Sequence, residues 1–209
     1  MEQINRDISP APSCLTKIFS GLPNYFKKGL AWKDKYLLTA DARKFNWGSH
    51  DKRKNSEYIV NSLGLISNNH CFYCDINSVT YGGIKPEIDH FNPKTLTPIK
   101  AYYYPNLNLC CGTCNSYKSD KFNRRYLLNF ANPNYNFDDY YYIDFATGHI
   151  IVLPNISYEN KKKARYTLFV LGVNKDSRPI LRRNELNAYN NSIIQVLDDF
   201  SYRYFINRA

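Results

Sequence analysis

The chain has 209 residues, which is long enough for one domain with its own hydrophobic core. Its net charge of +10 and pI of about 9.2 suit a polyanionic partner, because phosphate contacts by basic side chains release counterions. No apolar run approaches the roughly 18–20 residues of a membrane-spanning helix. The first residues also lack the pattern of a secretion signal, so we expect a cytoplasmic protein.

Residues 1–69 are expected to form an N-terminal helical segment. Residues 1–13 are polar and contain two prolines, which favours a loose arm. Apolar residues then recur at helical spacing in three stretches, and Pro23 ends the first of them. The expected helices cover residues 15–22, 33–45 and 55–66, with a charged loop at residues 48–55.

Residues 126–209 are expected to form a hairpin followed by helices. Alternating residues on either side of the turn at residues 146–148 predict the hairpin. The next helix should end at Gly172, since glycine is typical of the position after a helix. A last helix, capped at residues 176–177, is expected to bury an apolar stripe that reaches Tyr204.

Two Cys-x-x-Cys pairs flank residues 75–110, and they predict a metal site. A gap of two residues lets both sulfurs of a pair face one ion, so two pairs can close a tetrahedral zinc site. A reducing compartment favours metal over disulfides, which are the alternative. We expect Cys110 and Cys14 to be core residues, and His70 to stay outside the site. The predicted ligands of this structural zinc ion are Cys71, Cys74, Cys111 and Cys114.

The residues between and after these pairs resemble those of a known nuclease family. His90, Asn106 and Asn115, interleaved with CFYC and CGTC, resemble the HNH or ββα-metal nucleases in the form whose last His is Asn. The similarity covers residues 70–125, and the four-Cys frame together with the DH and CN dipeptides makes it specific.

The resemblance implies roles for four residues. Asp89 and Asn115 would be oxygen ligands of one catalytic Mg²⁺ or Mn²⁺ ion, and neutral His90 would be the general base. Asn106 would brace the loop between the two strands. Mg²⁺ prefers hard oxygen ligands and keeps several waters, which leaves room for a phosphate. An imidazole with a pKa of about 6.5 can accept a proton from water at neutral pH.

Three lysines near this centre are candidate contacts to nucleic-acid phosphates. Lys118 follows Asn115 by about one helical turn, which places both on one side of a helix. Lys94 and Lys121 are weaker candidates for the same role. Glu87, two residues before Asp89, is interpreted as a surface acid, with support of the metal site as the alternative. Outside this family frame, the Asp89-His90 pair could also be a structural turn.

Together these features predict an α+β fold. A zinc-stapled ββα-metal core at residues 70–125 would be packed within N- and C-terminal helices and a β-hairpin, as a single compact domain. A module this short has little core of its own, so zinc would stabilise its fold. Phosphodiester hydrolysis would be the expected reaction.

The order of the flanking motifs is similar to that of PtuB-type HNH proteins, the nuclease components of Septu and retron-associated anti-phage systems. This resemblance implies a PtuA-like ATPase partner, and the chain itself contains no Gly-rich phosphate loop. One departure is NFANP before the hairpin, where an acid is expected. DNA is the expected substrate ahead of RNA. The alternatives are a stand-alone restriction or homing nuclease, and a non-catalytic zinc module that binds nucleic acid or a protein, which would not need Asp89, His90 and Asn115.

Overall fold

The computed structural model describes residues 1, 3–50, 52–77 and 85–209. It has an α+β fold, in which four two-stranded antiparallel sheets are distributed among seven α-helices in these ranges. Each sheet is formed by two strands that are consecutive in the chain. Within the described ranges, none of the helices combines the length and apolar character needed to cross a membrane.

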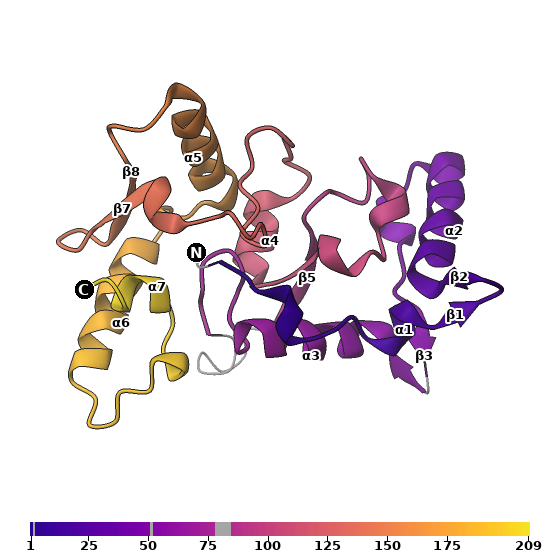
Figure 1. The fold of residues 1–209 in the computed structure, drawn as a ribbon, viewed down its shortest axis with the longest axis horizontal. Coiled ribbons are helices and arrows are strands. Elements are labelled where there is room, and N and C mark those ends of the chain that lie inside the picture. Colours follow the sequence, from indigo (N-terminus) through magenta and orange to yellow (C-terminus); the bar gives the residue numbers. More distant parts are fainter. Residues whose placement is uncertain (2, 51, 78–84) are drawn as a thin grey trace.

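The N-terminal elements lie on one side of the molecule and the C-terminal helices on the other, with β5 and α4 between them (Figure 1). The N-terminal elements are α1 (Ser13–Thr16), β1 (Ile18–Phe19), β2 (Leu22–Pro23), α2 (Asn24–Thr39), β3 (Ser49–His50), β4 (Arg53–Lys54) and α3 (Asn55–Ser67). The central elements are β5 (Glu87–His90), β6 (Leu107–Cys110) and α4 (Gly112–Lys118). The C-terminal elements are β7 (Tyr141–Asp144), β8 (His149–Val152), α5 (Tyr158–Leu171), α6 (Arg178–Asn190) and α7 (Arg203–Ile206).

The central strands and helix follow the predicted order. β5 and β6 pair in a register that sets Asp89 opposite Asn108 and His90 opposite Leu107. All four residues of β6 are buried, and Cys111 directly after it is the N-cap of α4. The chain therefore passes from a buried strand straight into the helix that carries Cys114 and Asn115.

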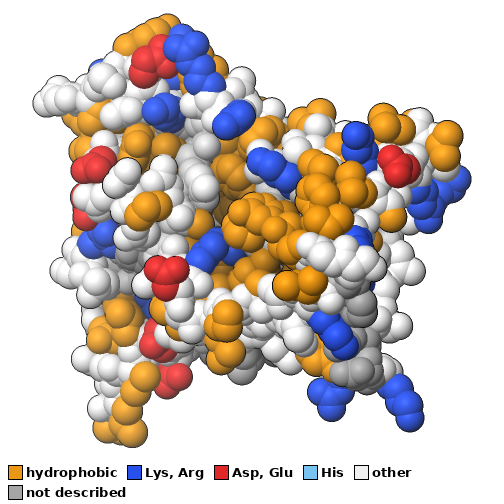
Figure 2. Space-filling view, turned by 45° about the vertical axis from the view of Figure 1, so that its right-hand side comes forward, with side chains coloured by type: hydrophobic (Ala, Val, Ile, Leu, Met, Phe, Trp, Pro, Cys, Tyr) orange, Lys and Arg blue, Asp and Glu red, His pale blue; other side chains and the backbone are white. Residues whose placement is uncertain are grey.

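Two hydrophobic clusters share this central segment. One cluster contains the C-terminal helices together with Cys71, Tyr73 and Cys74. The other lies among α1, α2 and α3 and contains Phe72. Successive side chains of residues 71–74 therefore serve different cores, and this short segment joins the two halves of the molecule. On the face drawn in Figure 2, Lys and Arg side chains flank a hollow in which hydrophobic side chains are visible.

Several predicted elements are confirmed. α3 lies within one residue of the predicted helix, and β7 and β8 form the predicted hairpin, with Asp144 opposite His149. α5 ends at Gly172, whose φ of 57° is the left-handed conformation that glycine adopts most easily. These elements depend on local patterns, which is why their sequences were sufficient to find them.

The first two predicted helices are wrong in their extent. α1 stops at Thr16, and the apolar residues after it form a small hairpin around Ser20 and Gly21. Both turn residues have positive φ, 50° and 77°, as a two-residue hairpin turn requires. α2 begins directly after Pro23 and ends at Thr39, because Ala40 after it has a φ of 48°, which breaks the helix. Two short paired strands, β3 and β4, occupy part of the predicted loop at residues 48–55.

The predicted loose arm is packed against the core. Met1 is fully buried, and the amide of Ile4 donates to the carbonyl of Phe130 at 2.8 Å. Arg6 donates through Nη2 to the carbonyl of Leu107 at 2.8 Å and to Oδ1 of Asn108 at 2.6 Å. Arg6 therefore holds the polar N-terminal arm against β6 through these hydrogen bonds.

The predicted long C-terminal helix is also wrong. α6 ends at Asn190, and Ile193 of the expected buried stripe is fully exposed. The side chains of Asn191 and Ser192 donate to nearby carbonyls, so they compete with continuation of the helix. Buried packing resumes with Tyr202, and Tyr204 belongs to the short helix α7.

Candidate zinc site and active site

The four predicted zinc ligands form a buried cluster, called here the four-cysteine cluster. The Sγ atoms of Cys71, Cys74, Cys111 and Cys114 lie within 4.8 Å of one another. The Cys74 and Cys111 sulfurs are 3.8 Å apart, and a tetrahedron with Zn–S bonds of about 2.3 Å has edges of about 3.8 Å. This donor set and spacing fit a structural zinc ion. Among the described residues it is the one cluster of His, Cys, Asp and Glu that could hold a metal.

The start of α4 orients the second pair of sulfurs. Cys111 Sγ accepts a hydrogen bond from the amide of Cys114 at 3.5 Å, as an N-cap side chain does. The start of α4 therefore also places the sulfurs of Cys111 and Cys114. The neighbouring candidates lie elsewhere: Cys110 Sγ donates to the carbonyl of Glu87 at 3.6 Å, and His70 Nε2 contacts the carbonyl of Phe200 at 2.9 Å.

Positive charge is needed to keep these sulfurs ionised. Burial raises the pKa of Cys71. The pKa of Cys114 is raised mainly by the hydrogen bond between Cys114 and Cys111. One cation is built into the fold, because buried Arg178 donates from Nη2 to Cys114 Sγ at 3.3 Å. Burial opposes the charge of Arg178, yet the Cys114 and Cys74 sulfurs raise its pKa above the ordinary value. Sequence reasoning missed Arg178, which lies 64 residues after Cys114 in a segment without a metal motif.

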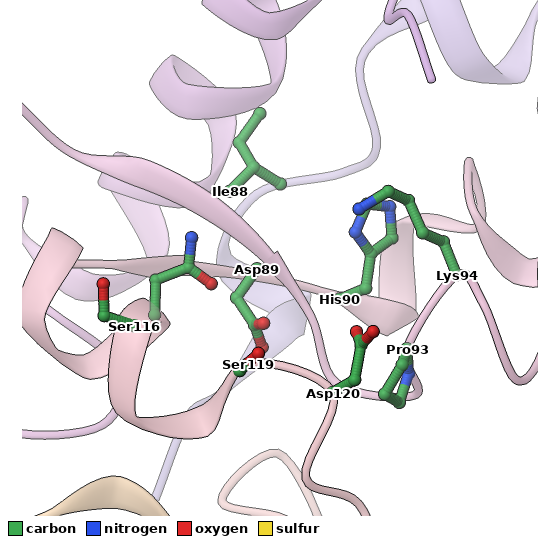
Figure 3. A pocket seen from close by; sticks show the side chains of 9 residues that line it. Ile88, Asp89, His90, Pro93, Lys94, Ser116, Ser119 and Asp120 are labelled. Atoms are coloured by element: carbon green, nitrogen blue, oxygen red, sulfur yellow. The ribbon is translucent and has the colours of Figure 1, made fainter. Parts of the chain in front are cut away.

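A polar pocket of about 270 Å³ lies at the end of β5 and along α4, and we call it the Asp89–His90 pocket (Figure 3). The residues that line it are Ile88, Asp89, His90, Pro93, Lys94, Asn115, Ser116, Ser119 and Asp120. It brings together Asp89, His90, Asn115 and Lys94 of the predicted set. Asn106, Lys118 and Lys121 are not among its lining residues.

His90 is held as a neutral imidazole with a defined tautomer. Its Nε2 lies 2.8 Å from the carbonyl oxygen of Ala101, which can only accept, so Nε2 carries the proton and Nδ1 has the free lone pair. The ring stacks on Trp47 with 5.4 Å between centroids and 1° between planes. Burial, with the nearby charge of Lys94, lowers the pKa of His90 to about 3. The predicted ordinary pKa is therefore corrected: the buried imidazole is neutral but is a weaker base.

Asp89 is buried beside the pocket and is held at both carboxylate oxygens. Oδ1 accepts from Lys118 Nζ at 2.9 Å, and Oδ2 accepts from the hydroxyl of Tyr73. Burial and the charge of Asp89 raise the pKa of Tyr73, so Tyr73 remains a protonated donor. Asn108 Nδ2 donates in turn to the Tyr73 hydroxyl at 2.8 Å. Each carboxylate oxygen has further acceptor capacity, which a metal ion could use.

Asn115 lies on α4 across the pocket from β5. Its Nδ2 donates to Glu87 Oε2 at 2.6 Å, which fixes the amide and leaves Oδ1 as its free oxygen. Glu87 was expected to be a plain surface acid. It is exposed, but the bond to Asn115 gives it an orienting contact at the site.

Asn106 lies behind the pocket and ties the β5–β6 loop together. Its Oδ1 accepts from the backbone amide and the side chain of Asn92, both at 2.8 Å. Its Nδ2 donates to the carbonyls of Asn92 and Lys100 at 3.1 and 3.2 Å. These bonds span the loop that carries Ala101, the partner of the His90 ring, which is the bracing position implied for this residue.

The structure corrects the expected place of Lys118. Its side chain is fully buried, and Nζ donates to Asp89 Oδ1 and, at 2.7 Å, to the carbonyl of His90. It has no exposed surface through which to contact a phosphate. Lys94 lines the pocket, whereas Lys121 Nζ donates to the carbonyl of Tyr117 at 2.9 Å outside it.

Three polar lining residues were missed by sequence reasoning: Ser116, Ser119 and Asp120. In Figure 3 the Ser119 and Asp120 side chains lie near Asp89 and Pro93. Helical spacing from Asn115 does not explain them, because α4 ends at Lys118 and Ser119, with a φ of 45°, turns the chain away from the helix. Trp47 was also missed, and nothing in its local sequence indicates a contact with His90.

No protein-family model and no curated protein matches this chain.

Proposed function

We propose that the protein is a metal-dependent nuclease of the HNH, or ββα-metal, kind that hydrolyses phosphodiester bonds of nucleic acids. The observation that carries the proposal is the meeting of Asp89, His90 and Asn115 in one polar pocket beside the four-cysteine cluster. A zinc-stapled pair of strands followed by a helix would be the ββα-metal core. A zinc module that only binds a partner has no need of this constellation.

His90 would act as the general base. The carbonyl of Ala101 holds the Nε2 proton, so Nδ1 is the atom that would take a proton from the attacking water. The low pKa of His90 keeps Nδ1 free at neutral pH, and an anionic phosphate bound nearby would raise it toward the useful range. Trp47 and the Ala101 carbonyl fix the plane of the ring before substrate arrives.

Asp89 and Asn115 would hold the catalytic Mg²⁺ or Mn²⁺, whose chemistry when bound is to stabilise the charge on the phosphate and the leaving oxygen. Lys118 and Tyr73 orient the Asp89 carboxylate, and Glu87 orients the Asn115 amide. Lys94, which lines the pocket, would attract the phosphate. DNA is the proposed substrate ahead of RNA.

The biological role that we propose is anti-phage defence, as a PtuB-like nuclease that works with a PtuA-like ATPase in the cytoplasm. Its support is the order of the motifs along the chain and the lack of a phosphate loop of its own. Exposed apolar side chains are compatible with a protein partner: Leu37 and Leu38 on α2 are 70% and 87% exposed.

Two features favour a second function, a zinc module that binds nucleic acid without cutting it. Both oxygens of Asp89 already accept hydrogen bonds, and the pKa of His90 is far below neutral. In that case the positive net charge would supply the affinity of the zinc module for nucleic acid. Cleavage assays separate the two functions.

The test is cleavage of plasmid DNA, linear DNA and total tRNA by the wild type and by His90→Ala, with Mg²⁺, with Mn²⁺ and after chelation. His149→Ala, which removes an imidazole from the exposed end of the β7–β8 hairpin, is the matched control. We expect metal-dependent cutting that His149→Ala retains and His90→Ala loses by roughly 10²–10⁴-fold. Equal cutting by zinc-loaded His90→Ala would refute the general base, and no cutting even with the ATPase present would favour the binding module.

A further inference from the structure

A second and larger cavity, of about 490 Å³, lies beside the Asp89–His90 pocket, and we call it the Arg124–Lys163 pocket. Its wall includes Phe91 and Asn92, the two residues that follow His90. The opposite wall comes from the segment after α4 and from α5, which contribute Arg124 and Lys163. Its volume is in the range of about 300–1,000 Å³ that is usual for small-molecule sites.

The charge on its wall is positive. Lys100, Arg124, Arg125 and Lys163 line the pocket, and no Asp or Glu is among its lining residues. Arg125 is paired with Glu159 at 3.2 Å, in an exposed contact. Within the described parts of the chain, no ion pair engages Lys100, Arg124 or Lys163. Three cations from separate segments therefore line one cavity whose lining includes no acid, which is an arrangement suited to an anion with more than one charge.

An aromatic ring accompanies these charges. Tyr103 lines the pocket, is 38% exposed and is steadied by Tyr25, with 5.5 Å between ring centroids. Base stacking on such a ring adds affinity in a way that tolerates any base. Cations together with an exposed ring are what a nucleotide, with its phosphates and base, requires of a binding site.

The two pockets share one braced wall. Asn92 lines the Arg124–Lys163 pocket and is held by Asn106, while His90, two residues earlier, lines the Asp89–His90 pocket. Because the hydrogen bonds of Asn106 fix residues 92 and 100 together, the wall is preformed. A strand whose phosphate sits at His90 could continue past this wall.

We infer that the Arg124–Lys163 pocket binds a nucleoside phosphate. Two sources share this chemistry: a nucleotide of the nucleic-acid strand that flanks the scissile phosphate, and a free nucleotide. The first source rests on the proposed nuclease function, whereas the second does not. Binding rather than cleavage is therefore the measurement that tests the pocket.

The experiment compares two double variants of the full-length zinc-loaded protein, each of which removes two positive charges. Arg124→Gln with Lys163→Gln changes the pocket. Lys161→Gln with Arg165→Gln changes the same helix, α5, at residues that do not line the pocket. Fluorescence anisotropy with a labelled single-stranded oligonucleotide and, separately, with a labelled ATP analogue gives the dissociation constants at several salt concentrations, without added divalent metal. Zinc content and thermal midpoints confirm that both variants are folded.

We expect the pocket variant to bind the oligonucleotide roughly tenfold more weakly than the control variant, with a salt-dependence slope about 1.4 smaller than that of the wild type. If only the ATP analogue is affected, the pocket holds a free nucleotide. Equal weakening in both double variants, or no binding of either probe by the wild type, would overturn the inference. The His90→Ala cleavage assay is independent of these outcomes, so a failure of the nuclease proposal is distinguishable from a failure of the pocket.

Discussion

Lys118 has an ionic partner, a carbonyl partner and no exposed surface. Its ammonium is the counter-ion of the buried Asp89 carboxylate, and it also fixes the backbone at His90. Lys118 therefore fixes the geometry of the pocket, because it holds the Asp89 carboxylate and the His90 backbone at once.

Lys118→Met should therefore destabilise the fold strongly. It leaves the Asp89 carboxylate buried without its cation, and breaking a buried pair in this way costs about 3–5 kcal/mol. Urea unfolding measures the loss. Lys121→Met, an exposed lysine three residues later, should change the free energy of unfolding by no more than about 0.5 kcal/mol. Adding Asp89→Asn to Lys118→Met should recover part of the lost stability. If Lys118→Met and Lys121→Met were equally stable, Lys118 would not be the counter-ion of Asp89.

The placement of single residues was only partly predictable. The Cys-x-x-Cys spacing was sufficient to find the four-cysteine cluster, and the motif predicted Asp89, His90 and Asn115, which line one pocket. The spacing of Lys118 on α4 could not show whether it faces solvent, since its partner lies 29 residues away on β5. For the same reason no local pattern indicates that Trp47 stacks on His90.

Among the elements, the N-terminal arm has an unexpected connection to the candidate active site. Arg6 donates to Asn108, Asn108 donates to Tyr73, and Tyr73 donates to Asp89. The guanidinium is also 5.6 Å from the centre of the Phe72 ring. A hydrogen-bonded chain therefore runs from the arm, through β6, to the acid of the Asp89–His90 pocket.

Arg6→Ala should loosen this chain. Hydrogen bonds from a charged group contribute about 1.5–3 kcal/mol, so we expect a loss of that size in the free energy of unfolding. Cleavage should fall as well, because Asp89 is positioned less firmly, while zinc content should not change. Arg43→Ala, which removes an exposed arginine from the N-terminal half, is the control. If the two variants behave alike, the arm does not support the site.

Elements with a strong local signature were predictable, and those that depend on distant contacts were not. Helix α3 and the β7–β8 hairpin follow from periodicity and turn residues. The arm looked unstructured because its order comes from Phe130 and β6, more than 100 residues away. The end of α6 depended on side chains that compete for its carbonyls, which an apolar stripe does not reveal.

At the scale of the whole molecule, the four-cysteine cluster belongs to the hydrophobic cluster of the C-terminal helices, while Phe72, between Cys71 and Cys74, belongs to the other hydrophobic cluster. Arg178 connects the four-cysteine cluster to the C-terminal half, since its Nη1 donates to the carbonyls of Leu171 and Gly172 while Nη2 reaches Cys114. The cluster is therefore tied to helices outside the segment that supplies its sulfurs. A bound zinc ion would add its stabilisation to both halves.

Removal of zinc with a strong chelator should unfold the protein cooperatively, seen as a loss of helical circular dichroism. Arg178→Gln should release zinc to a chromogenic chelator more readily, with metal affinity lower by about 10–100-fold, because contacts that support ligands have effects of this size. Arg183→Gln, an exposed arginine on the same helix, should behave as the wild type. Unchanged zinc affinity in Arg178→Gln would show that the charge of Arg178 does not support zinc binding at Cys114.

Asp75, which directly follows the first Cys-x-x-Cys pair, is buried and forms a 2.6 Å ion pair with the half-buried Arg203. This pair can form only after Arg203 has been synthesised. The two residues are 128 positions apart. At about 5–20 residues per second, the ribosome reaches Arg203 about 6–26 seconds after it has added Asp75. Cys111 and Cys114 are added 36 and 39 residues after Asp75, so Cys71 and Cys74 lack their companion cysteines only early in that interval, and they lack the C-terminal cover until its end. The nascent chain therefore passes through a period in which cellular thiol chemistry and free zinc compete for it before the fold can close.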